Sequence, residues 1–219
     1  MNITETEKEQ NRHLIRGMII DNTLSHQAGR LSPGEKIRLI ERKFRDIMLI
    51  LGLDLEDDSL KDTPLRVDKM YVNETFSGLL PENEPDITLF DNKYNYREML
   101  VEKNIPLFSC CEHHFVPIVG KAHIAYISAG TVIGLSKLNR VVGCFSKRPQ
   151  VQERLTVQIA EYLKNALGTE NVAVIINAEH LCVAARGVRD TGCSTVTSSY
   201  HGAFLNEDKR SELHRLLNT

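Results

Sequence analysis

The sequence lacks an uninterrupted apolar run of the roughly 20 residues that a membrane-spanning helix needs. Its first residues, MNITETEKEQNRHL, are polar and contain no apolar core of a signal peptide. An excess of one charge is also missing, because 27 basic and 29 acidic side chains give a formal net charge of −2. We therefore expect a cytoplasmic protein, with neither a membrane nor a nucleic acid as its partner.

Internal repeats, low-complexity tracts and a GxxxxGKS or GxxxxGKT phosphate loop are absent as well, which excludes repeat proteins and P-loop nucleotide sites. Five cysteines are an odd number, and Cys110 and Cys111 are adjacent, which argues against a framework of disulfide bonds. In a reducing compartment, thiols near histidines are more often metal ligands or catalytic groups. The cysteines therefore point to a site rather than to covalent cross-links.

The sequence pattern changes near residue 95, and we expect a helical region over residues 1–95 and a catalytic domain over residues 96–219. Helices are expected over residues 4–28, from a capping box at Ser32-Pro33-Gly34-Glu35 to Gly52, and from Thr63 to before Gly78. The composition of residues 81–95 predicts a loop.

Strands dominate after residue 95. We expect strands over residues 99–104 and 107–110, a strand over residues 115–127 that turns at Gly120-Lys121, and strands over residues 172–186 and 193–204. Helices are expected from a cap at Ser136, from Pro149 to Gly168, and after a cap at Asn206. Two strand pairs separated by two helices make an α+β arrangement.

Two short segments carry candidate metal ligands, CEHH at residues 111–114 and HLC at residues 180–182. Cys111 and His114 need a tight turn to come together, whereas His180 and Cys182 share one face of the expected strand. Thiolate and imidazole are the ligands that zinc prefers, at about 2.0–2.3 Å. Each residue alone has a plainer interpretation, because a cysteine in a strand is commonly a small core residue.

The spacing alone leaves two kinds of zinc site open. Four ligands, Cys111, His114, His180 and Cys182, would make a closed structural site, whereas three ligands and a water would make a catalytic one. The spare histidines favour the catalytic site, because imidazoles titrate near neutral pH, where general acids and bases are needed.

The string GLSKLNR, residues 134–140, places a hydroxyl, an ammonium and a guanidinium at the start of an expected helix. Helix N-termini favour phosphate, and Arg186 lies on the ligand-bearing face of its expected strand. A capped helix with solvated charges is the plainer interpretation. In RPQVQERL, residues 148–155, Glu153 stands in a first helical turn, where a carboxylate can accept two hydrogen bonds from a guanine edge.

The sequence resembles the GTP cyclohydrolase I family through DTPLR, CEHHF, GLSKLNR, RPQVQERLT and HLCVAARG, in the family's order and spacing over about residues 60–205. The resemblance implies the tunnelling fold, in which N-terminal helices precede a four-stranded antiparallel sheet with two helices between the strand pairs. It implies hydrolysis of GTP to 7,8-dihydroneopterin triphosphate and formate, the first step of folate and pterin biosynthesis. It also implies one zinc ion per subunit, and a homodecamer of two pentamers with sites at subunit interfaces.

The resemblance further implies a role for each matched residue. The zinc ligands would be Cys111, His114 and Cys182, and the proton-transfer residues would be His113 and His180. Glu153 would bind the guanine edge, with Gln152 beside it. The triphosphate would be held by Ser136, Lys137, Arg140, Arg186, Arg66 and Lys69.

Two other functions stay open at this point. A different enzyme of the same fold could act on a pterin or a purine without opening its ring, and the cationic residues would then have no triphosphate to hold. A non-catalytic protein could bind GTP or a partner protein beside a closed zinc site. The number of protein ligands on the metal, and the products formed from GTP, separate these alternatives.

Overall fold

The computed structural model describes residues 31–219, so the helix expected over residues 4–28 lies outside the described residues. The helices are α2 (Pro33–Ile50), α3 (Thr63–Met70), α4 (Leu135–Ser146), α5 (Gln152–Leu167), α6 (Leu181–Ala184) and α7 (Glu207–Leu217). The strands are β1 (Leu89–Asp91), β2 (Met99–Cys111), β3 (Pro117–Ile127), β4 (Thr131–Ile133), β5 (Pro149–Gln150), β6 (Val172–His180) and β7 (Thr195–Tyr200). Within residues 31–219, no helix is both long enough and apolar enough to cross a membrane.

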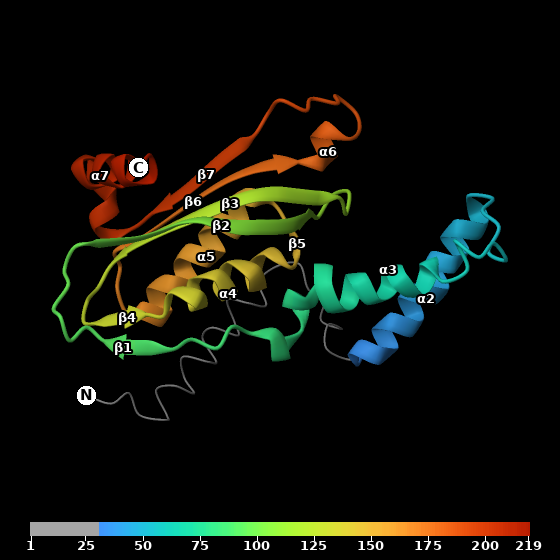
Figure 1. Cartoon of the computed structure of the whole chain (residues 1–219), viewed down its shortest axis with the longest axis horizontal. Coiled ribbons are helices and arrows are strands. Elements are labelled where there is room, and N and C mark those ends of the chain that lie inside the picture. The colour runs from blue at the N-terminus through green and yellow to red at the C-terminus, as the bar shows by residue number, and fades with distance from the viewer. Residues whose placement is uncertain (1–30) are drawn as a thin grey trace.

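A five-stranded sheet lies at the centre of the molecule, in the order β5-β2-β3-β6-β7 (Figure 1). β2, β3, β6 and β7 pair antiparallel with their neighbours, and the short β5 adds a parallel edge beside β2. β1 and β4 form a separate two-stranded sheet. The chain is therefore mixed α and β, as the sequence predicts.

The main core lies between the sheet and the helices α4 and α5, which cover one of its faces (Figure 1). Leu155, Ile159 and Leu163 are fully buried there, at the helical spacing that the sequence shows. A smaller core on the other face includes Phe204 and Leu213, the latter from α7.

β2 and β3 are longer and less interrupted than predicted. β2 is a single strand that continues through the gap predicted at residues 105–106, and its one irregularity lies between Glu102 and Ile105. β3 continues through Gly120, where a turn was predicted. A Cβ at Gly120 would lie 2.2 Å from the carbonyl oxygen of Asn177. Glycine therefore permits the close approach of β6 here, and the predicted turn was wrong.

Two predicted helix starts were also wrong. Gly134 is the N-cap residue of α4, and Ser136 does not cap the helix. Pro149 belongs to β5, where it pairs with Cys110, and α5 begins only at Gln152. A proline has no N–H to donate to a neighbouring strand, and the edge position of β5 tolerates this.

Long-range pairing explains two further differences. The predicted loop over residues 81–95 contains β1, because Leu89–Asp91 pair with Thr131–Ile133, more than 35 residues later in the sequence. The strand predicted over residues 193–204 extends only over Thr195–Tyr200. Gly202, with a φ of 54°, then starts a 3-10 helix, and a Cβ there would lie 2.4 Å from Oδ1 of Asn171.

Several helix ends fall where the sequence predicts them. Ser32 and Glu35 form the expected capping box at α2. Gly168 takes the left-handed conformation after α5, with a φ of 62°. Asn206 caps α7 by accepting a hydrogen bond from the backbone N–H of Asp208 (2.8 Å). These ends depend on local residues, which is why the sequence alone locates them.

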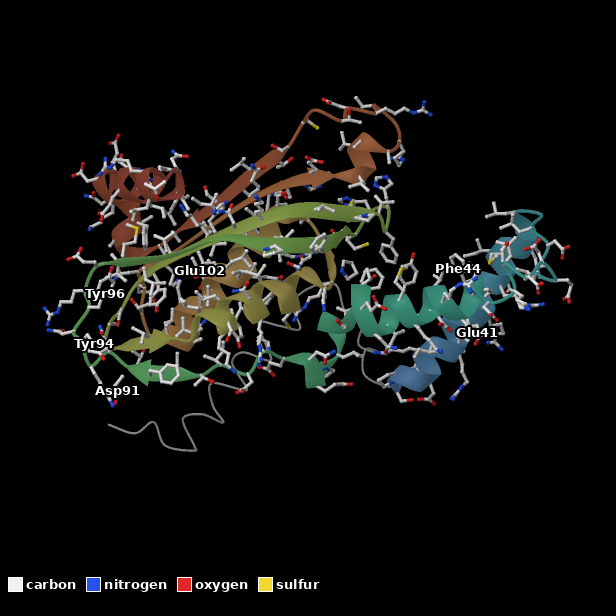
Figure 2. The ribbon with its side chains drawn as sticks, in the orientation of Figure 1. Glu41, Phe44, Asp91, Tyr94, Tyr96 and Glu102 are labelled. Carbon is white, nitrogen blue, oxygen red and sulfur yellow. The ribbon has the colours of Figure 1, made fainter. Side chains whose placement is uncertain are left out.

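α2 and α3 form an arm that projects from the sheet (Figure 1). Figure 2 shows Glu41 and Phe44 on this arm, and Tyr94 and Tyr96 at the opposite end of the molecule. The last turns of α2 expose apolar side chains, and Ile50 is 83% exposed. The exposed apolar residues of this segment are Ile47, Leu49, Ile50 and Leu51. A contiguous exposed apolar surface typically marks an interaction site.

The pH dependence of stability provides a test of the β2–β3 packing. His123 accepts a hydrogen bond at Nδ1 from the backbone N–H of Asn104 (3.3 Å). Burial, followed by the charges of Lys121 and Lys103, lowers the pKa of His123 from 6.5. The unfolded chain then binds a proton that the folded chain does not, so the free energy of unfolding decreases as the pH falls below about 6.5.

We expect a His123→Asn variant to lose part of this pH dependence. Urea unfolding of both proteins between about pH 5 and pH 8 measures it. The difference in stability between wild type and variant should become smaller as the pH falls. A difference that stays constant over this range would contradict the assignment.

Candidate metal centre and substrate site

Cys111 is the last residue of β2, and it starts the turn that leads into β3. Its backbone N–H donates to the carbonyl oxygen of Val116 (2.9 Å), and the N–H of Phe115 donates to the carbonyl oxygen of Cys111 (2.8 Å). Phe115 has a φ of 53°, in the left-handed region. The closed turn brings His114 back toward Cys111, with 4.0 Å between Sγ and Nδ1. The tight turn that the spacing of these residues requires is present.

Cys182 reaches the same place from the other side of the sheet, but not on a strand. β6 ends at His180, which pairs with Ile118 near the start of β3, and residues 181–184 form the short helix α6. Beyond this point β6 has no pairing partner, so the chain closes a hydrogen bond from the N–H of Ala185 to the carbonyl oxygen of Leu181 (2.9 Å). The expectation that His180, Cys182 and Arg186 share one strand face was therefore wrong.

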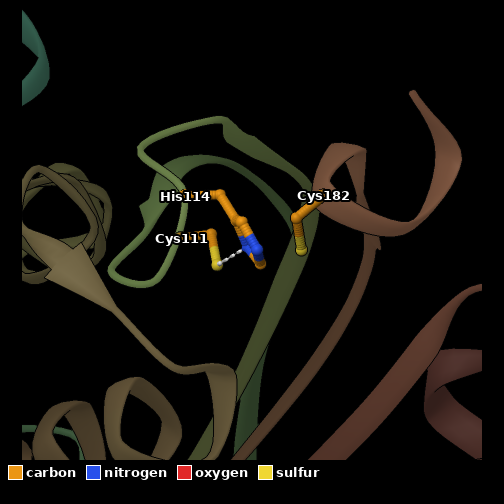
Figure 3. A group of neighbouring side chains, drawn as sticks. All are labelled: Cys111, His114 and Cys182. Atoms are coloured by element: carbon orange, nitrogen blue, oxygen red, sulfur yellow. Dashed lines mark hydrogen bonds between the residues drawn. The ribbon is translucent and has the colours of Figure 1, made fainter. Parts of the chain in front are cut away.

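The three donors nevertheless come together. The ligand atoms of Cys111, His114 and Cys182 lie within 4.8 Å of one another (Figure 3). Tetrahedral zinc with two thiolates and one imidazole separates its ligand atoms by about 3.6–3.8 Å. Small side-chain rotations would bring the three atoms around one ion, so the residues fit the metal that the family resemblance implies.

The environment of the thiols is consistent with this fit. Burial, followed by contact with Cys111, raises the pKa of Cys182, whereas the charge of Arg186 opposes the change. Without a metal the Cys182 thiol therefore stays protonated at neutral pH. A bound dication deprotonates a coordinating thiol. The two sulfurs are therefore better suited to bind a metal than to form a free, reactive thiolate.

His180 stands beside this group in a fixed orientation. Its Nε2 lies 2.8 Å from Oε1 of Gln152. The amide nitrogen of Gln152 donates to the backbone oxygens of Ile176 (3.1 Å) and Thr195 (2.9 Å) and to Oγ1 of Thr197 (3.1 Å), so Oε1 faces the imidazole. His180 therefore carries its proton on Nε2 when neutral, and Nδ1 is the nitrogen that can exchange a proton.

The same contacts determine how His180 and Gln152 can act. Burial lowers the pKa of His180, although the charge of Glu153 opposes this. Gln152 is only 1% exposed and all its amide groups are bonded within the chain, so it lies behind His180 rather than at an open substrate edge. With Nε2 occupied, His180 is separate from the three-ligand group found among the described residues.

His113 and Arg186 complete the surroundings of the metal group. The side chain of His113 is 62% exposed, and its Nδ1 lies 3.8 Å from Sγ of Cys111. Arg186 Nη1 lies 2.9 Å from Nε2 of His114. An exposed imidazole and a guanidinium therefore border the site on its solvent side. Glu153, exposed in the first turn of α5, adds a carboxylate on the side of His180.

The other residues expected to hold the triphosphate lie away from the Cys111–His114–Cys182 group. Ser136 and Lys137 are at the N-terminal end of α4, beside β1 and β4, and Lys137 forms an ion pair with Asp86 (3.3 Å). Figure 1 shows β1 and β4 at the opposite end of the sheet from α6. Arg140 lines a cavity of about 440 Å³ between α4 and residues 73–86. Within one chain, Ser136 and Lys137 therefore do not lie beside the Cys111–His114–Cys182 group.

Arg66 and Lys69 lie on α3 and are exposed, three residues apart and so on one side of the helix. Arg66 donates to the backbone oxygen of Ser59 (2.8 Å). The chain continues from α3 into a π-helical turn and then to Phe76, whose ring centroid lies 5.2 Å from that of Phe115. The arm thus contacts the turn of residues 111–116 through apolar side chains, while Arg66 is hydrogen-bonded within residues 59–66.

A polar network behind the turn was not predicted. Arg154 of α5 donates to Glu112 (2.6 Å) and to the backbone oxygen of Pro149 (3.0 Å), and Gln150 accepts another of its hydrogen bonds (3.0 Å). The only signal in the sequence is that a glutamate stands inside the CEHH motif and an arginine inside RPQVQERL. Nothing in either motif alone indicates that the two are paired.

The comparison with known proteins agrees with this geometry. The sequence profile described as GTP cyclohydrolase I matches residues 40–218. The chain belongs to the GTP cyclohydrolase I family. A protein named GTP cyclohydrolase 1 from Flavobacterium johnsoniae is 54% identical over 191 residues, which cover 87% of this chain and 86% of the relative.

Other members of the GTP cyclohydrolase I family are similarly close. A protein named GTP cyclohydrolase 1 from an Enterobacter species is 51% identical over 197 residues, covering 90% of this chain and 89% of the relative. One from Buchnera aphidicola is 48% identical over 203 residues, covering 93% and 92%. The likeness therefore extends over both the projecting arm and the sheet.

Metal binding tests the donor group directly. We expect the wild-type chain to bind one Zn²⁺, and a Cys182→Ala variant to lose affinity by at least about 100-fold, because changes outside the ligand shell already cost about 10–100-fold. Competition with a chromophoric chelator measures the affinity. Cys193→Ala is the matched control, because this exposed thiol lies outside the group. Equal affinity in all three proteins would remove Cys182 from the site.

Proposed function

We propose that this chain hydrolyses GTP to 7,8-dihydroneopterin triphosphate and formate with a zinc ion as cofactor, the first step of folate and pterin biosynthesis. The observation that carries the proposal is the Cys111–His114–Cys182 group beside two further histidines, in a chain of the GTP cyclohydrolase I family. We propose these three residues as the zinc ligands. A zinc ion held by them supplies an electrophile and a water that is activated near neutral pH.

The proposed reaction opens the imidazole ring of the purine. Water adds at C8 and the ring opens to a formamide; a second water releases formate, and the ribose rearranges before the pterin ring closes. N7 needs a proton as the ring opens, and His180 is proposed to deliver it from Nδ1 after that nitrogen has taken a proton up, because Gln152 holds Nε2. The exposed His113 is suited to carry protons between the site and solvent.

The substrate contacts divide between the two ends of the molecule. Glu153 lies near His180 and is proposed to accept the hydrogen bonds of the guanine edge. Gln152 is proposed to contribute to the site indirectly, by orienting His180. Arg186, which lies beside His114, is proposed to hold the triphosphate. The other proposed triphosphate ligands are Ser136, Lys137, Arg140, Arg66 and Lys69.

A homo-oligomer would bring these ends together. We propose the tunnelling fold for the catalytic domain over residues 96–219, a helical N-terminal region over residues 1–95, and a homodecamer of two pentamers with sites at subunit interfaces. Two features support assembly: Ser136 and Lys137 lie at the end of the sheet away from their own metal group, and α2 exposes the apolar residues described above.

Product analysis tests the proposed reaction. Incubation of the zinc-loaded protein with GTP should produce formate and, after oxidation, fluorescent neopterin in equal amounts. Cys111→Ser should reduce both by several orders of magnitude while circular dichroism stays unchanged, because serine breaks the zinc ligand set but is nearly isosteric with the buried cysteine. Cys193→Ser is the control. GTP binding without formate would instead favour an enzyme or binding protein that leaves the ring intact.

Subunit mixing tests the shared site. Lys137→Ala and Cys182→Ala proteins should each be inactive alone, because each lacks one part of every site. When the two are expressed together, roughly a quarter of the sites should combine an intact Lys137 with an intact Cys182, by random pairing. Activity that stays absent in the mixed protein would show that one chain supplies both residues.

A further inference from the structure

A partly buried ion pair lies beside the turn of residues 111–116, which carries Cys111 and His114. Glu112, between Cys111 and His113, accepts a hydrogen bond at Oε2 from Nη2 of Arg154 (2.6 Å). The two side chains are 25% and 23% exposed. A short, charge-assisted hydrogen bond between half-sheltered groups is stronger than an ordinary surface ion pair. Glu112 is not one of the three residues of the ligand group found among residues 31–219, which are Cys111, His114 and Cys182.

Arg154 is held rigidly at its other atoms. Its Nε donates to Oε1 of Gln150 (3.0 Å), and Nη2 also donates to the backbone oxygen of Pro149 (3.0 Å). Gln150 is 1% exposed, and its amide nitrogen donates to the backbone oxygen of Phe145 (3.0 Å). The backbone N–H of Glu112 donates to the backbone oxygen of Gln150 (3.1 Å). β5 and Arg154 therefore fix both the main chain and the side chain of Glu112.

The first turn of α5 contacts both sides of the site. Gln152 reaches His180 from it, and Arg154 reaches Glu112. Residues two apart on a helix point to nearly opposite sides, because each residue turns the helix by about 100°. This one helical turn consequently fixes the separation between the Cys111–His114 turn and the His180 side chain.

We propose that Glu112 and Arg154 are a positioning pair that sets the geometry of the Cys111–His114 turn for metal binding. Neither side chain belongs to the three-ligand group, and Oε1 of Glu112 also lies 3.8 Å from Nε2 of His113, so the pair acts on the turn through its backbone and through His113. Without it, the turn keeps its backbone hydrogen bonds, including that of Glu112 to Gln150, but loses its side-chain contact with α5. This inference rests on the proposed function only in taking the metal to be zinc.

Metal affinity is the measurement that tests the pair. Glu112→Gln and Arg154→Met should each lower the affinity for Zn²⁺ by about 10–100-fold, the range seen when groups behind metal ligands are changed. Substituted Co²⁺ should still show sulfur-to-metal charge transfer in both variants, because the thiols remain. Lys209→Met is the matched control, because it breaks the ion pair of Lys209 with Glu212 (2.8 Å) on α7, far from the turn.

A double variant separates positioning from general destabilisation. If the pair acts as one unit, the Glu112→Gln and Arg154→Met changes together should cost little more affinity than either alone. Thermal unfolding of the metal-free proteins is measured in parallel, and Arg154→Lys should retain an intermediate affinity, since lysine keeps the charge but not the fork. Should Arg154→Met fail to fold, the isosteric Glu112→Gln variant carries the test.

The test of the positioning pair and the test of the proposed function can fail separately. Wild-type zinc affinity in both single variants, or strictly additive losses in the double variant, would overturn the positioning pair whatever the reaction is. A wild-type protein that binds zinc tightly but forms no formate from GTP would instead overturn the proposed function and leave the pair standing.

Discussion

Cys111 donates its backbone N–H to Val116 and accepts a hydrogen bond from Phe115, and the resulting closed turn decides where the candidate ligands lie. Each of these bonds contributes about 1 kcal/mol net, whereas the left-handed conformation of Phe115 costs about 1–3 kcal/mol. Gain and cost are of the same size, so the turn depends on its neighbours. β5, α5 and the ring of Phe76 supply that support from three directions.

Local signals in the sequence were sufficient for much of the fold. The capping box at Ser32, the left-handed Gly168 and the cap at Asn206 are where predicted, because each depends on residues within one helical turn. β1 was missed because its partner β4 lies far along the chain and its three residues carry no signal of their own. The role of Gly120 was misread for the same reason, since only the position of β6 explains it.

In the candidate site, too, local motifs were visible in the sequence, whereas contacts between motifs were not. The structure brings together Cys111, His114 and Cys182, the set that the family resemblance implies, whereas residue types and spacing alone left His180 open as a fourth ligand. The strand geometry expected for Cys182 was wrong, because the pairing of β6 with β3 ends at His180. The pairing of Glu112 with Arg154 and the contact of Gln152 with His180 join residues from separate motifs. A single sequence does not show such pairs, since each depends on how α5 packs against the sheet.

Gly120 has a consequence for how this chain can change over evolution. It leaves no room for a side chain against Asn177, and two residues further along the same pairing Ile118 lies opposite His180. A one-residue insertion in β3 or β6 would drive a Cβ into the neighbouring backbone and turn His180 to the other face of the sheet. Within this strand pair a side chain at position 120 and a change of length are both costly, and divergence by insertion is confined to the loops outside it.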